Sequence, residues 1–98
     1  MASLRIDGEA AQDLARIAAH LSLHEVQDID ERIADIFDAL QLLLRHPLIG
    51  RPVDGVRRDL VIGSGHRGYV ARYRFDELDD TVIVLGLRAQ REMGFEDR

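Results

Sequence analysis

The first half of the chain carries apolar residues at helical spacing. One set predicts a helix from about Gly8 to Leu21, with Asp7 in the position of its N-cap: Ala10, Leu14, Ile17, Ala18 and Leu21. The stretch "SLHE", from Ser22 to Glu25, has the form of a capping box and predicts that a second helix starts there. Its apolar stripe comprises Val26, Ile29, Ile33, Ile36, Leu40 and Leu43, and Pro47 ends it.

The second half alternates like a set of strands. "RRDLVI", "RGYVARYRF" and "TVIVLGLR" are separated by the short polar stretches "GSGH" and "DELDD", which suit hairpin connections, and "SLRI" near the start predicts one more strand. The order is therefore β-α-α-β-β-β. We expect an α+β fold, one domain over residues 1–98, with a helical hairpin packed on one face of a mostly antiparallel four-stranded sheet.

The strand within residues 67–75 has two unlike faces. Tyr69, Ala71, Tyr73 and Phe75 form its most apolar row, so we expect the helices to cover that side. Arg72 and Arg74 then project from the uncovered side, where guanidinium groups stay hydrated or meet a partner.

Charge is unevenly distributed along the chain. The formal net charge is -5, yet residues 50–75 carry six Arg against two acids, between two acidic blocks, and every one of the 13 basic residues is arginine. A local basic block favours a local anionic or acidic protein partner over general coating of nucleic acid, with an ordinary mixed surface as the alternative.

Several other classes of protein are disfavoured. The chain has no cysteine and no apolar run long enough to span a bilayer, which favours a soluble, unprocessed cytoplasmic protein with no membrane role. His20 and His24 have the spacing of a helical metal pair, but the predicted helix break at Ser22 separates them. We expect no metal and no cofactor.

Four stretches, taken in order, carry a resemblance to a known family: "RHPLIGRP", "RRDLVIG", "GYVARYRF" and "VIVLGLRAQREMGF". Together they resemble the RelE/ParE superfamily of type II toxin-antitoxin toxins, also called plasmid stabilisation proteins. The last stretch is similar to the ending of ParE-like members, although Ala89 stands where histidine is usual and Phe95 where tyrosine is usual.

The resemblance implies a growth-arresting toxin neutralised by a cognate antitoxin. Binding of the antitoxin would also allow an oligomeric complex to form. RelE-like members cleave messenger RNA on the ribosome, using lysines on the preceding strand, an arginine just after "GY" and a tyrosine near the C-terminus. Here Val70 follows "GY", Phe95 is near the end, and lysine is absent. Arginine binds phosphate well but is a poor base, because it stays protonated at neutral pH. The residues therefore favour the ParE branch, whose members inhibit DNA gyrase without an established hydrolytic site.

The expected target-binding surface is a set of arginines: Arg58, Arg72, Arg74, Arg88 and Arg91. Some of them have a purely structural alternative, as ion-pair partners of Asp59, Asp79 or Glu92. A ribosome-dependent ribonuclease is the alternative function, and His66 is then the candidate general base. A third reading is a degenerate member that binds the antitoxin but has lost toxicity.

Overall fold

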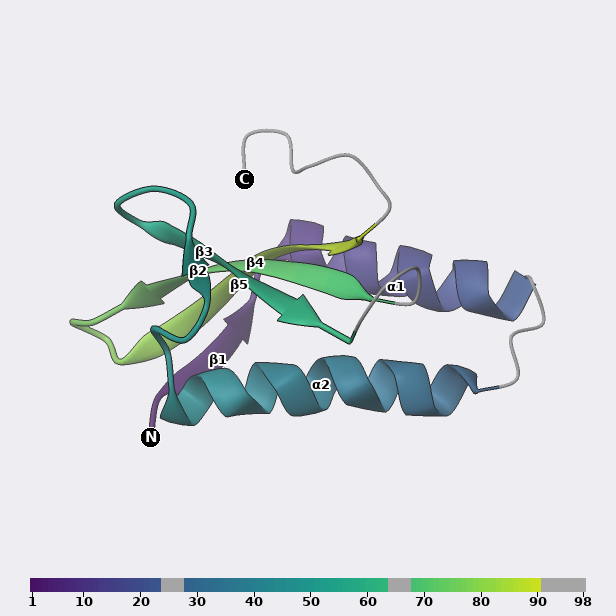
Figure 1. Ribbon diagram of the computed structural model, residues 1–98, viewed down its shortest axis with the longest axis horizontal. Helices are drawn as coiled ribbons and strands as arrows, with labels where there is room; N and C mark the ends of the chain where they lie inside the picture. Colours follow the sequence, from purple (N-terminus) through teal and green to yellow (C-terminus); the bar gives the residue numbers. More distant parts are fainter. Residues whose placement is uncertain (24–27, 64–67, 91–98) are drawn as a thin grey trace.

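The computed structural model describes residues 1–23, 28–63 and 68–90. Two helices and five strands follow one another in this part of the chain: β1 (Ser3–Ile6), α1 (Gly8–Leu23), α2 (Ile29–Arg45), β2 (Arg51–Pro52), β3 (Arg57–Ile62), β4 (Tyr69–Asp76) and β5 (Thr81–Ala89). Figure 1 shows them in one view, with α2 running below the sheet.

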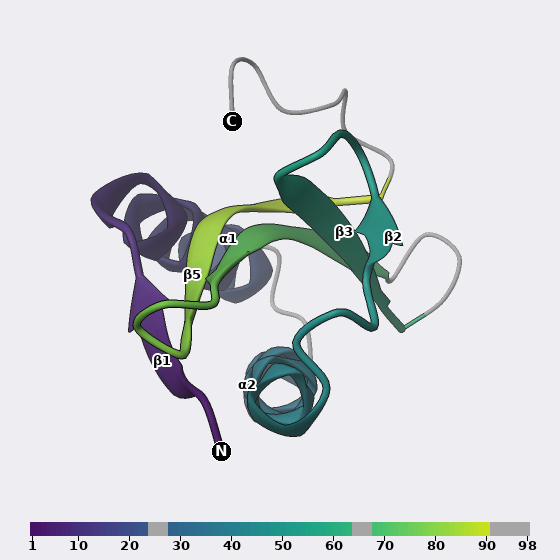
Figure 2. The same ribbon diagram turned by 90° about the vertical axis from the view of Figure 1, so that its left-hand side faces the viewer.

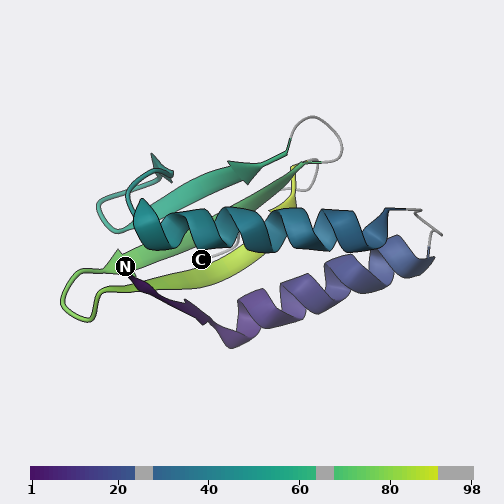
Figure 3. The same ribbon diagram turned by 90° about the horizontal axis from the view of Figure 1, so that it is seen from below.

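The strands form one sheet in the order β1-β5-β4-β3-β2, in which only the β1 and β5 pair is parallel. Seen along α2, the sheet fans out above that helix (Figure 2). Seen from below, α1 and α2 lie side by side in front of the strands (Figure 3). The predicted α+β fold, a helical hairpin on a mostly antiparallel sheet, is confirmed.

The predicted number of strands was wrong, because the sheet has five strands rather than four. The additional strand, β2, consists of Arg51 and Pro52, which pair with Asp59 and Arg58 of β3. Two residues, one of them a proline, are too few to show an alternating pattern. The other four strands coincide with the predicted ones to within two residues at each end.

The predicted start of the second helix was also wrong. Ser22 lies inside α1, which continues to Leu23, and the described part of α2 begins at Ile29 with Asp28 in the N-cap position. Glu25 of the expected capping box lies outside the described residues. No helix in residues 1–23 or 28–45 is both long and apolar enough to cross a lipid bilayer.

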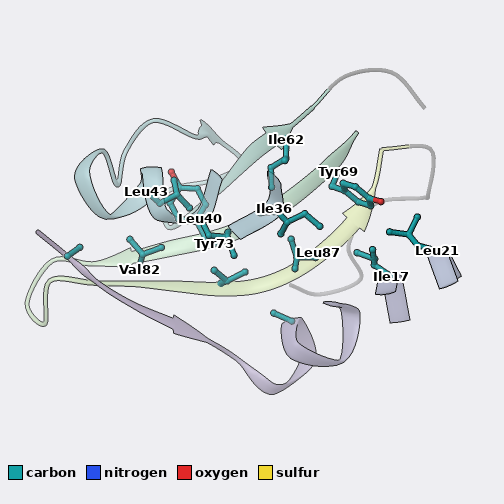
Figure 4. Packing of buried hydrophobic residues seen from close by; sticks show 14 residues of the cluster. Ile17, Leu21, Ile36, Leu40, Leu43, Ile62, Tyr69, Tyr73, Val82 and Leu87 are labelled. Atoms are coloured by element: carbon teal, nitrogen blue, oxygen red, sulfur yellow. The ribbon is translucent and has the colours of Figure 1, made fainter. Parts of the chain in front are cut away.

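The core lies between the helices and the sheet (Figure 4). Its largest fully buried side chains come from α2, β4 and β5: Ile36, Leu40, Leu43, Tyr73, Val82, Val84 and Leu87. In β4 the residues Tyr69, Ala71 and Tyr73 are all buried, whereas Val70, Arg72 and Arg74 are partly exposed. The expected apolar row of β4 therefore faces the helices.

A β-bulge in β5 resets which of its side chains reach the core. Arg72 of β4 is paired with Gly86 and the next residue, Tyr73, with Val84, so that Leu85 is the extra residue. Strict alternation from Val84 would turn Arg88 toward the core, because side chains repeat every two residues. With the bulge, Leu87 is fully buried and Arg88 shares the face of Val70.

Asp13 joins α1 to the edge of the sheet. The pairing of β1 with β5 ends at Val84, so the β5 backbone beyond that residue has no strand neighbour on this side. The buried carboxylate of Asp13 accepts a hydrogen bond of 2.9 Å from the backbone N–H of Leu87. A helical side chain thus satisfies an edge donor that would otherwise be buried without a partner.

Tyr73 connects the core to the loop after α2. Its ring is fully buried, and its hydroxyl accepts a hydrogen bond of 2.9 Å from the backbone N–H of Gly50. Burial raises the pKa of the phenol, so it remains neutral at physiological pH. A Cβ atom at Gly50 would lie 2.6 Å from Cε1 of Tyr73.

We expect Gly50→Ala to destabilise the protein by about 1–3 kcal/mol, because the new methyl group overlaps a ring that has no free space around it. The matched control is Gly55→Ala, since a Cβ atom there meets nothing within 4 Å. The control should stay within about 0.5 kcal/mol of wild type. Urea denaturation measures both, and equal stability of the two variants would contradict this packing.

Candidate functional site

The face of the sheet away from the helices is rich in arginine. We call it the arginine face. Each strand contributes one or two arginines to it: Arg5, Arg51, Arg57, Arg72, Arg74 and Arg88. Strand pairing places them in rows, with Arg51, Asp59 and Arg72 in one row and Arg57, Arg74 and Arg5 in the next. The period of two along each strand therefore collects guanidinium groups from all five strands.

A bidentate ion pair occupies the middle of this face. Arg72 Nε lies 2.8 Å from Asp59 Oδ1, and Arg72 Nη2 lies 3.0 Å from Asp59 Oδ2. The two side chains retain only 13% and 10% of their exposure. The pKa of Arg72 is raised, chiefly by the hydrogen bonds to Asp59. Both carboxylate oxygens are thus occupied by one permanently charged partner.

Asp54 fixes the β2-β3 connection. Its Oδ1 accepts backbone hydrogen bonds from Val56, at 2.8 Å, and from Arg57, at 2.7 Å. Its Oδ2 accepts from Arg57 Nε at 2.8 Å and from Arg57 Nη2 at 2.6 Å. These hydrogen bonds hold the pKa of Asp54 well below its usual value. The backbone N–H of Arg57 has the largest effect, followed by the N–H of Val56 and by the guanidinium of Arg57.

Two members of the arginine face are not neutralised within the described residues. No hydrogen bond or ion pair joins the side chain of Arg51 or Arg74 to another described residue, whereas Arg5 lies 3.5 Å from Asp7. Arg74 is also directly opposite Arg57 on the neighbouring strand. Like charges in that position destabilise a sheet.

The structure brings together only part of the predicted arginine set. Arg72, Arg74 and Arg88 share the arginine face, but Arg58 is paired with the buried Tyr73 and so faces the helix side. There its Nη1 donates hydrogen bonds of 2.9 Å to the carbonyl oxygens of Leu48 and Gly50, which ties down the loop before β2. Arg91 lies outside the described residues, as does His66.

Sequence reasoning missed Arg51 and Arg57. Arg57 could have been found, because Leu60 and Ile62 must face the core and the period of two then assigns Arg58 to the core side and Arg57 to the open side. Arg51 could not, since it lies on the two-residue strand β2. Gly86 was an unused signal of the bulge, because an isolated glycine inside a strand often marks one.

Comparison with known proteins supplies the family. A family described as the ParE toxin of the type II toxin-antitoxin system, parDE, matches residues 4–94. The chain belongs to this ParE toxin family. No curated protein matches the chain.

Two solved structures resemble the fold of this ParE-family chain. The chromosomal ParDE toxin-antitoxin system from P. aeruginosa contains a chain with 22% sequence identity and a TM-score of 0.71, covering 91% of this chain and 96% of its own length. The toxin-antitoxin complex RelBE2 from Mycobacterium tuberculosis contains one with 22% identity and a TM-score of 0.60, covering 91% and 98%. At this identity the likeness concerns the fold alone.

We expect Asp59→Ala and Arg72→Ala each to lower the free energy of unfolding by about 1–3 kcal/mol, because each removes the bidentate ion pair from a largely buried side chain. The double variant should lose less than the sum of the two. A double-mutant cycle by urea denaturation measures the coupling. Additivity within about 0.3 kcal/mol would show that the pair contributes nothing.

We expect Asp54 to make stability depend on pH at the acidic end. Its folded pKa is lowered from the value of 3.8 for a free side chain, so its contribution is complete well above pH 3.8 and is lost as the pH falls below it. The difference in unfolding free energy between wild type and Asp54→Asn should therefore shrink from about pH 6 to about pH 2.5. A constant difference across that range would contradict the assignment.

Proposed function

We propose that this chain is the toxin of a type II toxin-antitoxin module, held inactive by a cognate antitoxin, and that it inhibits DNA gyrase by binding it. Growth arrest and stabilisation of a plasmid carrying the module would follow. Membership of the ParE toxin family supports the toxin role, and the two similar structures are of toxin-antitoxin systems.

One observation carries the choice of binding over cleavage. The carboxylate at the centre of the arginine face, Asp59, has both oxygens engaged by Arg72. Cleavage of RNA by its own 2'-hydroxyl requires a group that accepts that proton. Guanidinium groups stay protonated at neutral pH and cannot supply it. The described histidines, His20 and His46, lie at the ends of α1 and α2.

The arrangement is, in contrast, well suited to holding an anionic group. Guanidinium donors have a fixed planar geometry that matches carboxylates and phosphates. Rigid strands position them, and the bidentate pair and the Asp54 contacts hold two of them in place. A surface of this kind inhibits by occupying its target.

The purified chain should inhibit supercoiling of relaxed plasmid by DNA gyrase, because the proposed activity is binding to that enzyme. Premixing with the antitoxin encoded beside it should restore supercoiling. Arg45→Gln is a matched control, since Arg45 is an exposed residue of the last turn of α2. This variant should inhibit like wild type.

Ribosome-bound transcripts incubated with the same preparation should remain intact. Full gyrase activity at large molar excess of folded protein would contradict the proposal. Cleaved transcripts would establish the ribonuclease alternative, and vigorous growth on expression without antitoxin would favour the degenerate member.

A further inference from the structure

We infer that the arginine face receives a carboxylate-rich segment of the protein that the toxin inhibits, held between Arg51 and Arg74. This inference rests on the proposed function and names the chemistry of its contact.

The charge pattern calls for an external anion. Arg57 and Arg74 are directly opposite each other, and only Arg57 has a carboxylate partner, Asp54. Arg51 is opposite Asp59, but that carboxylate is already bound by Arg72 through both oxygens. Two cations thus flank the central pair without compensation from the described residues. A bound anion would remove the repulsion that the free protein carries.

Carboxylates fit this face better than a nucleic acid. Proteins that bind single strands stack the bases on aromatic side chains. The described aromatic residues of the sheet, Tyr69, Tyr73 and Phe75, belong to the row that faces the helices. The net charge of -5 also repels a polyanion at long range.

Exposed acidic residues along α2 add to this repulsion on the other side of the molecule: Asp30, Glu31, Asp35 and Asp38. A short acidic peptide segment can approach the arginine face without meeting them.

The β2-β3 hairpin adds apolar contacts beside the arginines. Its connection, residues 53–56, rises on the side of the sheet away from α2 in both Figures 1 and 2. Val53 and Val56 are 40% and 66% exposed there, and Val61 of β3 is 60% exposed. Asp54 fixes the backbone between the two valines. A peptide would therefore meet rigid apolar groups, which lowers the entropy cost of binding.

The polar character of the face favours a reversible contact with the target over a permanent one with the antitoxin. Permanent interfaces are larger and more apolar than transient ones. Several of the larger exposed apolar side chains lie on α2 and the loop after it: Phe37, Leu42, Leu48 and Ile49. Others are Met1, Leu23 at the end of α1 and Leu78 between β4 and β5. A charged surface with a few valines suits association that depends on electrostatic attraction.

Binding of a fluorescent peptide of alternating Glu and Ala, measured by anisotropy, tests the inference. We expect the wild type to bind it, and added NaCl to weaken the complex. Arg74→Gln and Arg51→Gln should each lose about tenfold in affinity, because each removes a guanidinium partner of a carboxylate. Arg45→Gln, which makes the same change of charge outside the arginine face, should bind like wild type.

An oligothymidine of similar length serves as the competing probe. Equal losses for Arg74→Gln and Arg45→Gln would overturn the inference, as would tighter, Arg74-dependent binding of the oligothymidine. Circular dichroism confirms that each variant is folded.

The supercoiling assay separates the two proposals. If the chain binds the peptide through Arg74 but does not inhibit gyrase, gyrase is not the target, and the arginine face remains a binding surface for carboxylates. If Arg74→Gln inhibits gyrase as strongly as wild type, the arginine face is not the contact surface, and gyrase remains the target.

Discussion

The alternation of side chains along β4 is the constraint on which the rest of the structure depends. Tyr73 is fully buried, and its hydroxyl accepts a hydrogen bond from the backbone N–H of Gly50. Strand β4 therefore cannot rotate or shift by one residue without removing that ring from the core. With Tyr73 fixed, Arg72 and Arg74 must project from the opposite side. The same residue that anchors the loop after α2 therefore fixes the direction of the arginines. Core packing and the candidate binding surface are two consequences of one strand register.

The bulge at Leu85 extends this logic to β5. Without the extra residue, the apolar phase of Val82 and Val84 would continue to Gly86 and Arg88, and a guanidinium would point into the core. One inserted residue thus places Leu87 in the core and Arg88 on the arginine face.

Much of the fold could be predicted from periodicity, because β4 and the stripe of α2 obey it, whereas the bulge interrupts the alternation of β5. Ile36, Leu40 and Leu43 were predicted as one face and are buried. The Ser22 capping box failed because a local hydrogen-bonding pattern competes with continued helix, and here α1 continues. The candidate site was predicted less well. Arg58 looked equivalent to Arg72, yet its strand pairing gives it a structural role. Strand pairing between distant segments decides such cases, and a sequence does not display it.

The charge on the arginine face is better explained by recognition than by stability. An isolated protein gains nothing from Arg74 opposite Arg57, and aspartate or threonine at position 74 would remove the repulsion. Arg72, on the same face, is neutralised by its bidentate pair with Asp59, in contrast to Arg74 opposite Arg57. Local arrangements that oppose stability concentrate at functional sites. Because all the cations are arginines, they remain charged whatever the partner does to the local environment, and the surface keeps its attraction as water is excluded on binding. The surface is therefore suited to the anionic partner that we propose, and its guanidinium groups cannot accept a proton at neutral pH.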